Sequence, residues 1–204
     1  MIVPLLLAVT IHEAAHGYVA YRMGDDTAML AGRLTLNPIK HLDLFGSFII
    51  PLVLSISGSP FIFGYAKPVP VNFTRIREYR KGVILVSGAG VVANMACAVA
   101  SGILFRMIVS LWHVPNLKLF VEPLATMLVY SVTINLLLAV FNLIPVPPLD
   151  GSRILGMFLP EELKWKYESI ERYGMLIIIV LLMTGIINDI IKFSVYPLRS
   201  LLLG

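Results

Sequence analysis

The chain is built from long apolar stretches that alternate with shorter polar connections. Apolar stretches cover residues 2–23, 82–112, 119–144 and 173–196, and each has the length and composition of a helix. The hydrocarbon core of a bilayer is about 30 Å thick, and a helix needs about 20 residues to cross it. We therefore predict an all-α polytopic membrane protein with about four transmembrane helices.

A fifth apolar stretch, residues 44–63, is interrupted by proline and by a Ser-Gly-Ser-Pro run. Residues 64–72 follow, and their alternating prolines exclude a helix and favour an extended backbone. We predict that residues 44–72 form a re-entrant hairpin, turning at residues 57–60, followed by an extended strand. A single crossing is the alternative.

Composition and charge agree with a membrane location. The chain is 58% hydrophobic and 14% charged, whereas about a quarter of the residues in a soluble domain are charged. The formal net charge is +4, but the basic residues gather in connections expected on one side, which indicates positive-inside topology rather than nucleic-acid binding. We predict a multi-pass protein of the cytoplasmic membrane with its N-terminus outside. The single cysteine, Cys97, excludes an intrachain disulfide and is interpreted as a packing residue.

The first apolar stretch carries three ionisable side chains, His12, Glu13 and His16. Helix positions i and i+4 lie on one face, so the two histidines can bind one metal ion together. Glu13 is placed to accept the proton of a metal-bound water. Ionisable groups in hydrocarbon need a compensating partner. We therefore favour a metal site over two unrelated histidines at a membrane edge.

A catalytic zinc ion has three protein ligands, so a third residue is required. Asp150 is the strongest candidate, because it follows a proline-rich run and precedes a glycine that permits a sharp turn. Taken alone, Asp150 would more simply cap the turn that follows it. His41 and Asp43 are weaker candidates, which we expect to be solvent-exposed loop residues. The remaining acidic candidates are Asp25, Asp26 and Glu122.

The third ligand also constrains the topology. If Asp150 reaches the two histidines, residues 82–112 and 119–144 must cross the membrane and return. Residues 24–81 then begin and end on one side, which is the argument for the hairpin and places the metal site near the cytoplasmic face. Non-helical backbone at membrane depth needs protein or water around it, so we expect a water-accessible pocket.

Two motifs together resemble the site-2 protease family of intramembrane zinc metalloproteases. They are His-Glu-Ala-Ala-His-Gly at residues 12–17 and Asn-x-x-Pro-x-x-x-Leu-Asp-Gly at residues 142–151. The resemblance implies that the two histidines and Asp150 bind one zinc ion per chain. It also implies that Glu13 is the general base and acid and that Asn142 lies near the scissile carbonyl.

The resemblance extends to two further segments. Residues 64–72 are similar to the loop of compact bacterial members without a PDZ domain. We expect this segment to pair with an unwound substrate as an edge strand or to be a rigid connector. Gly90 and Asn94 match a Gly-x-x-x-Asn motif, although the family has proline where this chain has Val91; they either support the site or serve helix packing. The substrate-binding candidates are Tyr65, Lys67, Val69, Val71 and Asn72.

The sequence thus predicts an intramembrane zinc endopeptidase that cuts in or near transmembrane segments of membrane-protein substrates. Residues 1–204 are expected to form one membrane-embedded domain, with a catalytic core at 1–160 and a C-terminal helical segment at 173–204. The alternatives are a membrane metalloprotease of another family, a catalytically silent scaffold and a metal transporter. No sequence feature selects a substrate or an oligomeric state.

Overall fold

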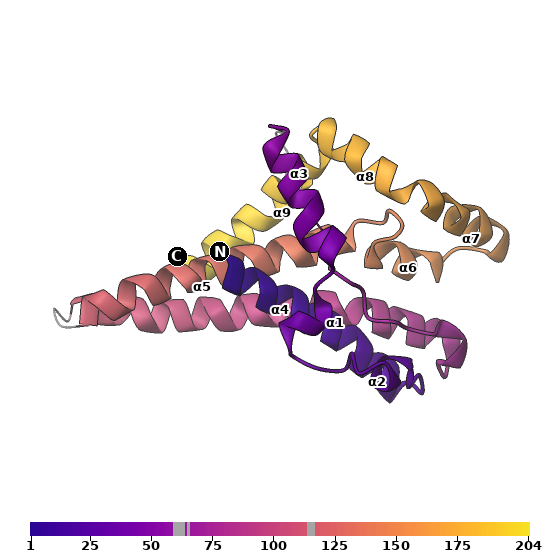
Figure 1. Ribbon diagram of the computed structural model, residues 1–204, viewed down its shortest axis with the longest axis horizontal. Coiled ribbons are helices and arrows are strands. Elements are labelled where there is room, and N and C mark those ends of the chain that lie inside the picture. The colour runs from indigo at the N-terminus through magenta and orange to yellow at the C-terminus, as the bar shows by residue number, and fades with distance from the viewer. Residues whose placement is uncertain (59–63, 65, 114–116) are drawn as a thin grey trace.

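Three long helices form the centre of the molecule. The computed structural model describes residues 1–58, 64, 66–113 and 117–204, and these residues form helices and irregular segments but no strand. Helix α4 (Tyr79–Val109) packs against both α1 (Ile2–Arg22) and α5 (Lys118–Leu143), as Figure 1 shows. Each of the three is long and apolar enough to cross a membrane. They confirm three of the predicted crossings and a multi-pass membrane protein.

Small side chains let these helices approach one another. Ala20 on α1, Ala98 on α4 and Ala139 on α5 are fully buried. Large apolar side chains instead point outward along the same helices, for example Val92 and Leu119. In a membrane, helices associate by close packing of small residues, while the lipid solvates large apolar ones. This distribution therefore fits a bundle surrounded by lipid.

The C-terminal part is a chain of shorter helices. The expected helix at residues 173–196 is two helices, and the path bends by 75° at the break between them. Gly185 lies in this break with a φ of 81°, a left-handed conformation that glycine adopts without steric cost. The last helix returns along α5 (Figure 1). The bounds are α6 (Asp150–Gly156), α7 (Glu161–Glu168), α8 (Gly174–Met183) and α9 (Ile186–Leu203).

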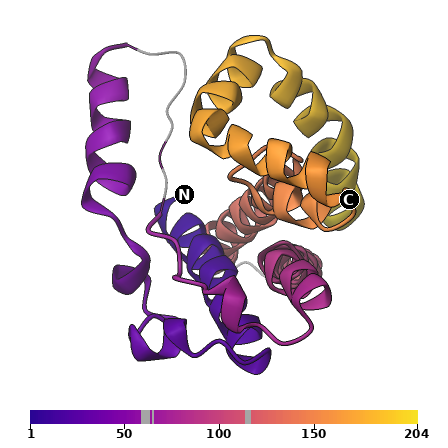
Figure 2. The same ribbon diagram turned by 90° about the vertical axis from the view of Figure 1, so that its right-hand side faces the viewer.

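The segment after residue 43 leaves the bundle and returns to it. A π-helical turn, η2 (Leu44–Ile49), leads into α3 (Ile50–Ile56), which stands apart from the other helices in Figure 2. Where the description resumes, a Cβ on Gly64 would lie 2.8 Å from the Gly46 carbonyl oxygen. The two ends of the excursion are therefore adjacent, as the predicted hairpin requires. The predicted turn at residues 57–60 lies partly outside the described residues.

The polar connection after α1 is packed rather than loose. It contains α2 (Thr27–Leu30) and the 3-10 turn η1 (Pro38–His41). The expectation that His41 is solvent-exposed is wrong. The residue is only 1% exposed, and its Nε2 lies 2.9 Å from the Thr35 carbonyl oxygen. The returning chain covers His41, since the Lys67 amide donates to the His41 carbonyl at 3.0 Å.

Asp43, expected to be exposed as well, is partly buried at the start of the excursion. Its carboxylate accepts a hydrogen bond from the Gly46 amide at 2.7 Å. A carboxylate in this position caps the first turn of a helix. Asp43 therefore has a local structural role and lies outside the metal group described below.

Candidate metal centre

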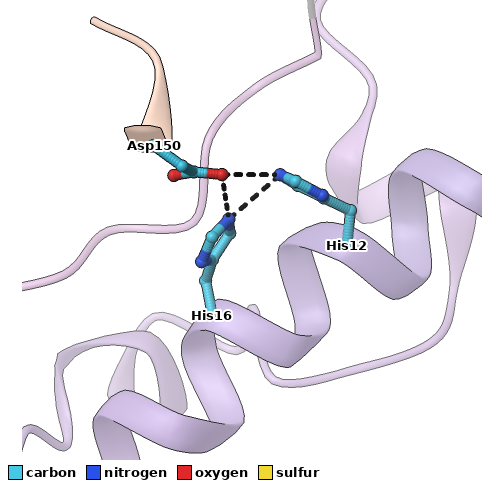
Figure 3. A group of neighbouring side chains, drawn as sticks. All are labelled: His12, His16 and Asp150. Atoms are coloured by element: carbon cyan, nitrogen blue, oxygen red, sulfur yellow. Dashed lines mark hydrogen bonds and ion pairs between the residues drawn. The ribbon is translucent and has the colours of Figure 1, made fainter. Parts of the chain in front are cut away.

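Three side chains from two distant parts of the sequence converge inside the bundle. His12 and His16 lie one turn apart on α1, and Asp150 is the first residue of α6. The two Nε2 atoms are 3.0 Å apart, and each lies 3.2 Å from Asp150 Oδ2 (Figure 3). Both histidines are buried. Among the described residues, this is the one group of His, Cys, Asp or Glu side chains with the spacing to hold a metal ion.

The spacing fits a tetrahedral ion. With bonds of about 2.0–2.1 Å, ligand atoms around zinc lie roughly 3.3 Å apart. The separations of 3.0 and 3.2 Å are close to this value. Two imidazole nitrogens and a carboxylate oxygen are also the donor types that a catalytic zinc site uses. The residues present therefore fit a zinc ion with one coordination position left open.

The far side of each imidazole ring is fixed by α4. His12 Nδ1 lies 3.2 Å from Asn94 Oδ1, and His16 Nδ1 lies 2.7 Å from the Val86 carbonyl oxygen. Because both partners are acceptors, each Nδ1 carries the proton and each Nε2 keeps its lone pair for a metal. The structure thus brings Asn94, which is fully buried, into direct contact with one of the candidate ligands.

Gly90 provides the space for both rings. A Cβ at this position would lie 2.5 Å from His12 Cε1 and 2.6 Å from His16 Nε2. Real Cβ atoms essentially never approach another atom so closely. Helix α4 therefore passes directly beside the metal group only because residue 90 has no side chain.

Asp150 is placed by the tight connection between α5 and α6. Helix α5 ends at Leu143, and Ile144 has an extended backbone that leads into the proline-rich run. A Cβ on Gly151 would lie 2.1 Å from the Leu143 carbonyl oxygen. The start of α6 is thus pressed against the end of α5, and this contact carries Asp150 to the histidines.

Glu13 lies beside the metal group at the edge of a cavity of about 350 Å³. Its Oε2 accepts a hydrogen bond from the Val69 amide at 2.7 Å. Asn142 also lines the cavity, and its amide group donates to the Leu138 carbonyl one turn earlier on α5. The cavity therefore joins the candidate ligands, the Glu13 carboxylate and the Asn142 amide in one space.

The predicted substrate-binding residues divide into two groups. Val69 and Val71 line the cavity, whereas Lys67 and Asn72 do not. Tyr65 lies outside the described residues. Residues 66–72 run as an extended segment with no strand partner within the described part of the chain. The cavity has six lining residues that the sequence analysis did not single out: Pro68, Phe73, Val86, Ser87, Pro148 and Arg153.

Fold and site together define a multi-pass membrane protein with a His–His–Asp group beside a glutamate, in which the histidines are buried and Asp150 is partly buried. The model of peptidase family M50 matches residues 106–185, which include Asp150 but not the two histidines. "Putative zinc metalloprotease YwhC" of Bacillus subtilis is 40% identical over 184 residues, which are 90% of this chain and 80% of that protein. No solved structure matches the chain.

Two mycobacterial proteins named "Putative zinc metalloprotease Rip2" are also similar. The Mycolicibacterium smegmatis protein is 30% identical over 183 residues, and the Mycobacterium tuberculosis H37Rv protein is 26% identical over 188 residues. Each alignment covers 90% of this chain and 66% of the relative. The chain belongs to peptidase family M50, which confirms the resemblance to site-2 proteases and identifies a membrane metallopeptidase.

Proposed function

We propose that the chain is an intramembrane endopeptidase that holds one zinc ion through His12, His16 and Asp150. Its substrates would be membrane proteins, cut in or near their transmembrane segments as a step of regulated intramembrane proteolysis. The convergence of three ligand atoms within the helix bundle carries the proposal. The names of the relatives support zinc as the metal. Membership of a peptidase family argues against the scaffold and transporter alternatives.

Glu13 is the proposed general base and acid. A zinc ion bound by the three ligands would supply a water of lowered pKa and a Lewis acid for the scissile carbonyl. The Val69 amide donates to Glu13 Oε2 and so fixes the orientation of the carboxylate. Oε1 then takes the proton from the water and returns it to the leaving amine. Asn142 donates a hydrogen bond to the substrate from the cavity wall.

The extended segment is the proposed substrate edge. Val69 and Val71 both line the cavity, as does Pro68. Pro68 and Pro70 have no amide hydrogen to offer, and the Val69 amide already donates to Glu13 Oε2. A peptide unwound from its helix would pair with the remaining amide and carbonyl groups of this segment. Water reaches the cut bond through the same cavity.

The site is proposed to lie near the cytoplasmic face of the cytoplasmic membrane, with residues 1–204 acting as one domain. Basic side chains gather at the end of α1, where Arg22, Arg75 and Arg77 line one surface hollow. Arg153 lines the metal cavity itself. Positively charged residues mark the cytoplasmic side of a membrane protein. Figure 1 shows this end of α1 beside α2.

The test compares wild type with Glu13→Gln and Asp150→Ala in detergent micelles. The probe is a fluorogenic transmembrane peptide of about 20 residues, and zinc is measured by mass spectrometry. We expect one zinc ion per wild-type chain with cleavage, zinc without cleavage in Glu13→Gln, and neither in Asp150→Ala. Glu78→Gln is the matched control, because Glu78 is exposed and pairs with Lys81 at the surface. Cleavage by Glu13→Gln at the wild-type rate would refute the proposal.

A further inference from the structure

The polar connection between α1 and the hairpin contains three buried ionisable residues that the proposed chemistry does not use. Asp25, Arg33 and His41 have 0%, 7% and 1% of their surface exposed. Burying an ionisable group is costly unless it is hydrogen-bonded. Asp25 and Arg33 form hydrogen bonds through their side chains with the backbone of the extended segment, residues 66–72, and His41 forms one through its main-chain carbonyl. The burial of Asp25 and Arg33 is therefore tied to the segment that passes Glu13.

Arg33 and His41 hold the beginning of this segment. Arg33 Nη2 donates to the Lys67 carbonyl at 2.7 Å and to the Pro68 carbonyl at 3.4 Å. The Lys67 amide donates in turn to the His41 carbonyl at 3.0 Å. Because a guanidinium stays charged at every physiological pH, its bonds to the two carbonyls are stronger than neutral ones. Lys67, at the start of the segment, is thus held through both its amide and its carbonyl group.

Asp25 holds the end of the segment. Its Oδ2 accepts a hydrogen bond from the Asn72 amide at 2.7 Å. Its Oδ1 accepts from the amide and the hydroxyl of Thr27, the first residue of α2. One buried carboxylate therefore joins the end of the extended segment to the helix that follows α1.

Between these two anchors the segment touches the proposed catalytic residue. The Val69 amide donates to Glu13 Oε2 at 2.7 Å. A Cβ on Gly17 would lie 3.1 Å from a Val69 methyl group. Helix α1 thus has no side chain at the point where the segment crosses it. The flanking residues Pro68 and Pro70 each have a fixed φ angle. Because the segment has little backbone freedom, a shift of either end would also move Val69.

We propose that Asp25 and Arg33 are positioning residues for substrate binding. They fix the register of the extended segment so that Val69 and Val71 face the cavity beside Glu13. This inference rests on the function proposed above, in which that segment pairs with the substrate. A shifted segment presents the wrong backbone groups to an incoming strand, so loss of either anchor weakens substrate binding.

The experiment uses the full chain in detergent micelles, with the fluorogenic transmembrane peptide as the probe. Asp25→Asn removes the charge but keeps the shape of the side chain. Arg33→Lys keeps the charge but removes the planar guanidinium group and its fixed N–H donors. We expect KM to rise roughly tenfold or more in each variant, the scale of one lost charged hydrogen bond. We expect kcat to change by less than about threefold and zinc content to be unchanged, since the metal ligands are not touched.

Hydrogen exchange gives a readout that does not depend on cleavage. Residues 66–72 contain two prolines, so a peptide covering them reports on few amides. We expect the Asn72 amide to exchange faster in Asp25→Asn than in wild type, because its acceptor is weakened. Asp26→Asn is the matched control. Asp26 is adjacent in sequence but pairs with the exposed Arg75, so KM and exchange should both stay at wild-type values.

Several outcomes would overturn the proposal. An unchanged KM in both variants would remove the link to substrate binding, and unchanged exchange at Asn72 would remove the anchor itself. Loss of zinc or of folded protein in both variants would assign the two residues to fold stability alone. Equal cleavage by wild type and Glu13→Gln would refute the proposed function instead. The hydrogen-exchange data would still show whether Asp25 holds the end of the extended segment.

Discussion

Replacement of Gly90 by alanine should separate metal binding from folding. The new Cβ would lie 2.5–2.6 Å from ring atoms of both histidines, roughly 0.8 Å closer than ordinary van der Waals contact. The rings must move by about that distance, whereas metal–ligand distances tolerate only about 0.2 Å. We therefore expect zinc affinity to fall by about a hundredfold, the upper end of the loss that follows when the surroundings of a metal ligand are disturbed.

The same substitution should not unfold the protein. Alanine is favoured over glycine inside a helix by about 0.8–1 kcal/mol, which offsets part of the strain from the displaced rings. Gly88→Ala is the matched control on α4, because nothing lies within 4 Å of the added Cβ. It should keep wild-type zinc affinity and become slightly more stable.

The assay is competition with a zinc chelator, combined with thermal unfolding in detergent micelles. Gly90→Ala should lose the metal at a chelator concentration at which Gly88→Ala keeps it. The metal-free forms of both variants should unfold near the temperature at which metal-free wild type unfolds. Wild-type zinc affinity in Gly90→Ala would refute the reasoning, because it would show that the rings are free to move or that they do not bind the metal.

Three further substitutions or conditions test other contacts. Asn94→Ala removes the acceptor for one imidazole and should lower zinc affinity about 10–100-fold in chelator competition; unchanged affinity would contradict the assigned contact. Gly151→Ala should lose both zinc and thermal stability, because its Cβ would lie 2.1 Å from a backbone oxygen of Leu143; a folded, zinc-loaded variant would disprove this. Burial raises the pKa of Asp25, but hydrogen bonds from Thr27 and neighbouring amides outweigh it and lower that pKa below the ordinary 3.8. Asp25 thus stabilises the fold above pH 3.8, and this contribution disappears as the pH falls through the lowered pKa; thermal unfolding across this range should show a smaller pH dependence in Asp25→Asn.

The sequence predicts most of the helical framework because apolar length alone identifies a membrane helix. The long helices α1, α4 and α5 lie within a few residues of the predicted stretches. The break at Gly185 was not predicted, since the surrounding residues are uniformly apolar and a glycine in such a run carries little signal. Helix direction after a break is set by packing against α5, which composition does not encode.

The two histidines of the metal group could be predicted from their spacing in the sequence, whereas the contacts around them could not. Two histidines four residues apart must share a helix face, and the structure brings Asp150 to them. The acceptor for His16 is the backbone carbonyl of Val86, which has no signature in the side-chain sequence. The burial of His41 likewise depends on the chain that returns near Lys67. Contacts made by backbone atoms across long separations are therefore the part that only the structure supplies.

The separation of the candidate ligands in sequence has a consequence for biosynthesis. His12 and His16 are made and inserted first, while Asp150 follows only after α4 and α5 have been synthesised. Under the proposed ligand set, a nascent chain that has not reached α6 holds only two of the three candidate ligands. We therefore expect full metal binding, and any activity that depends on it, to begin only after α6 has been synthesised.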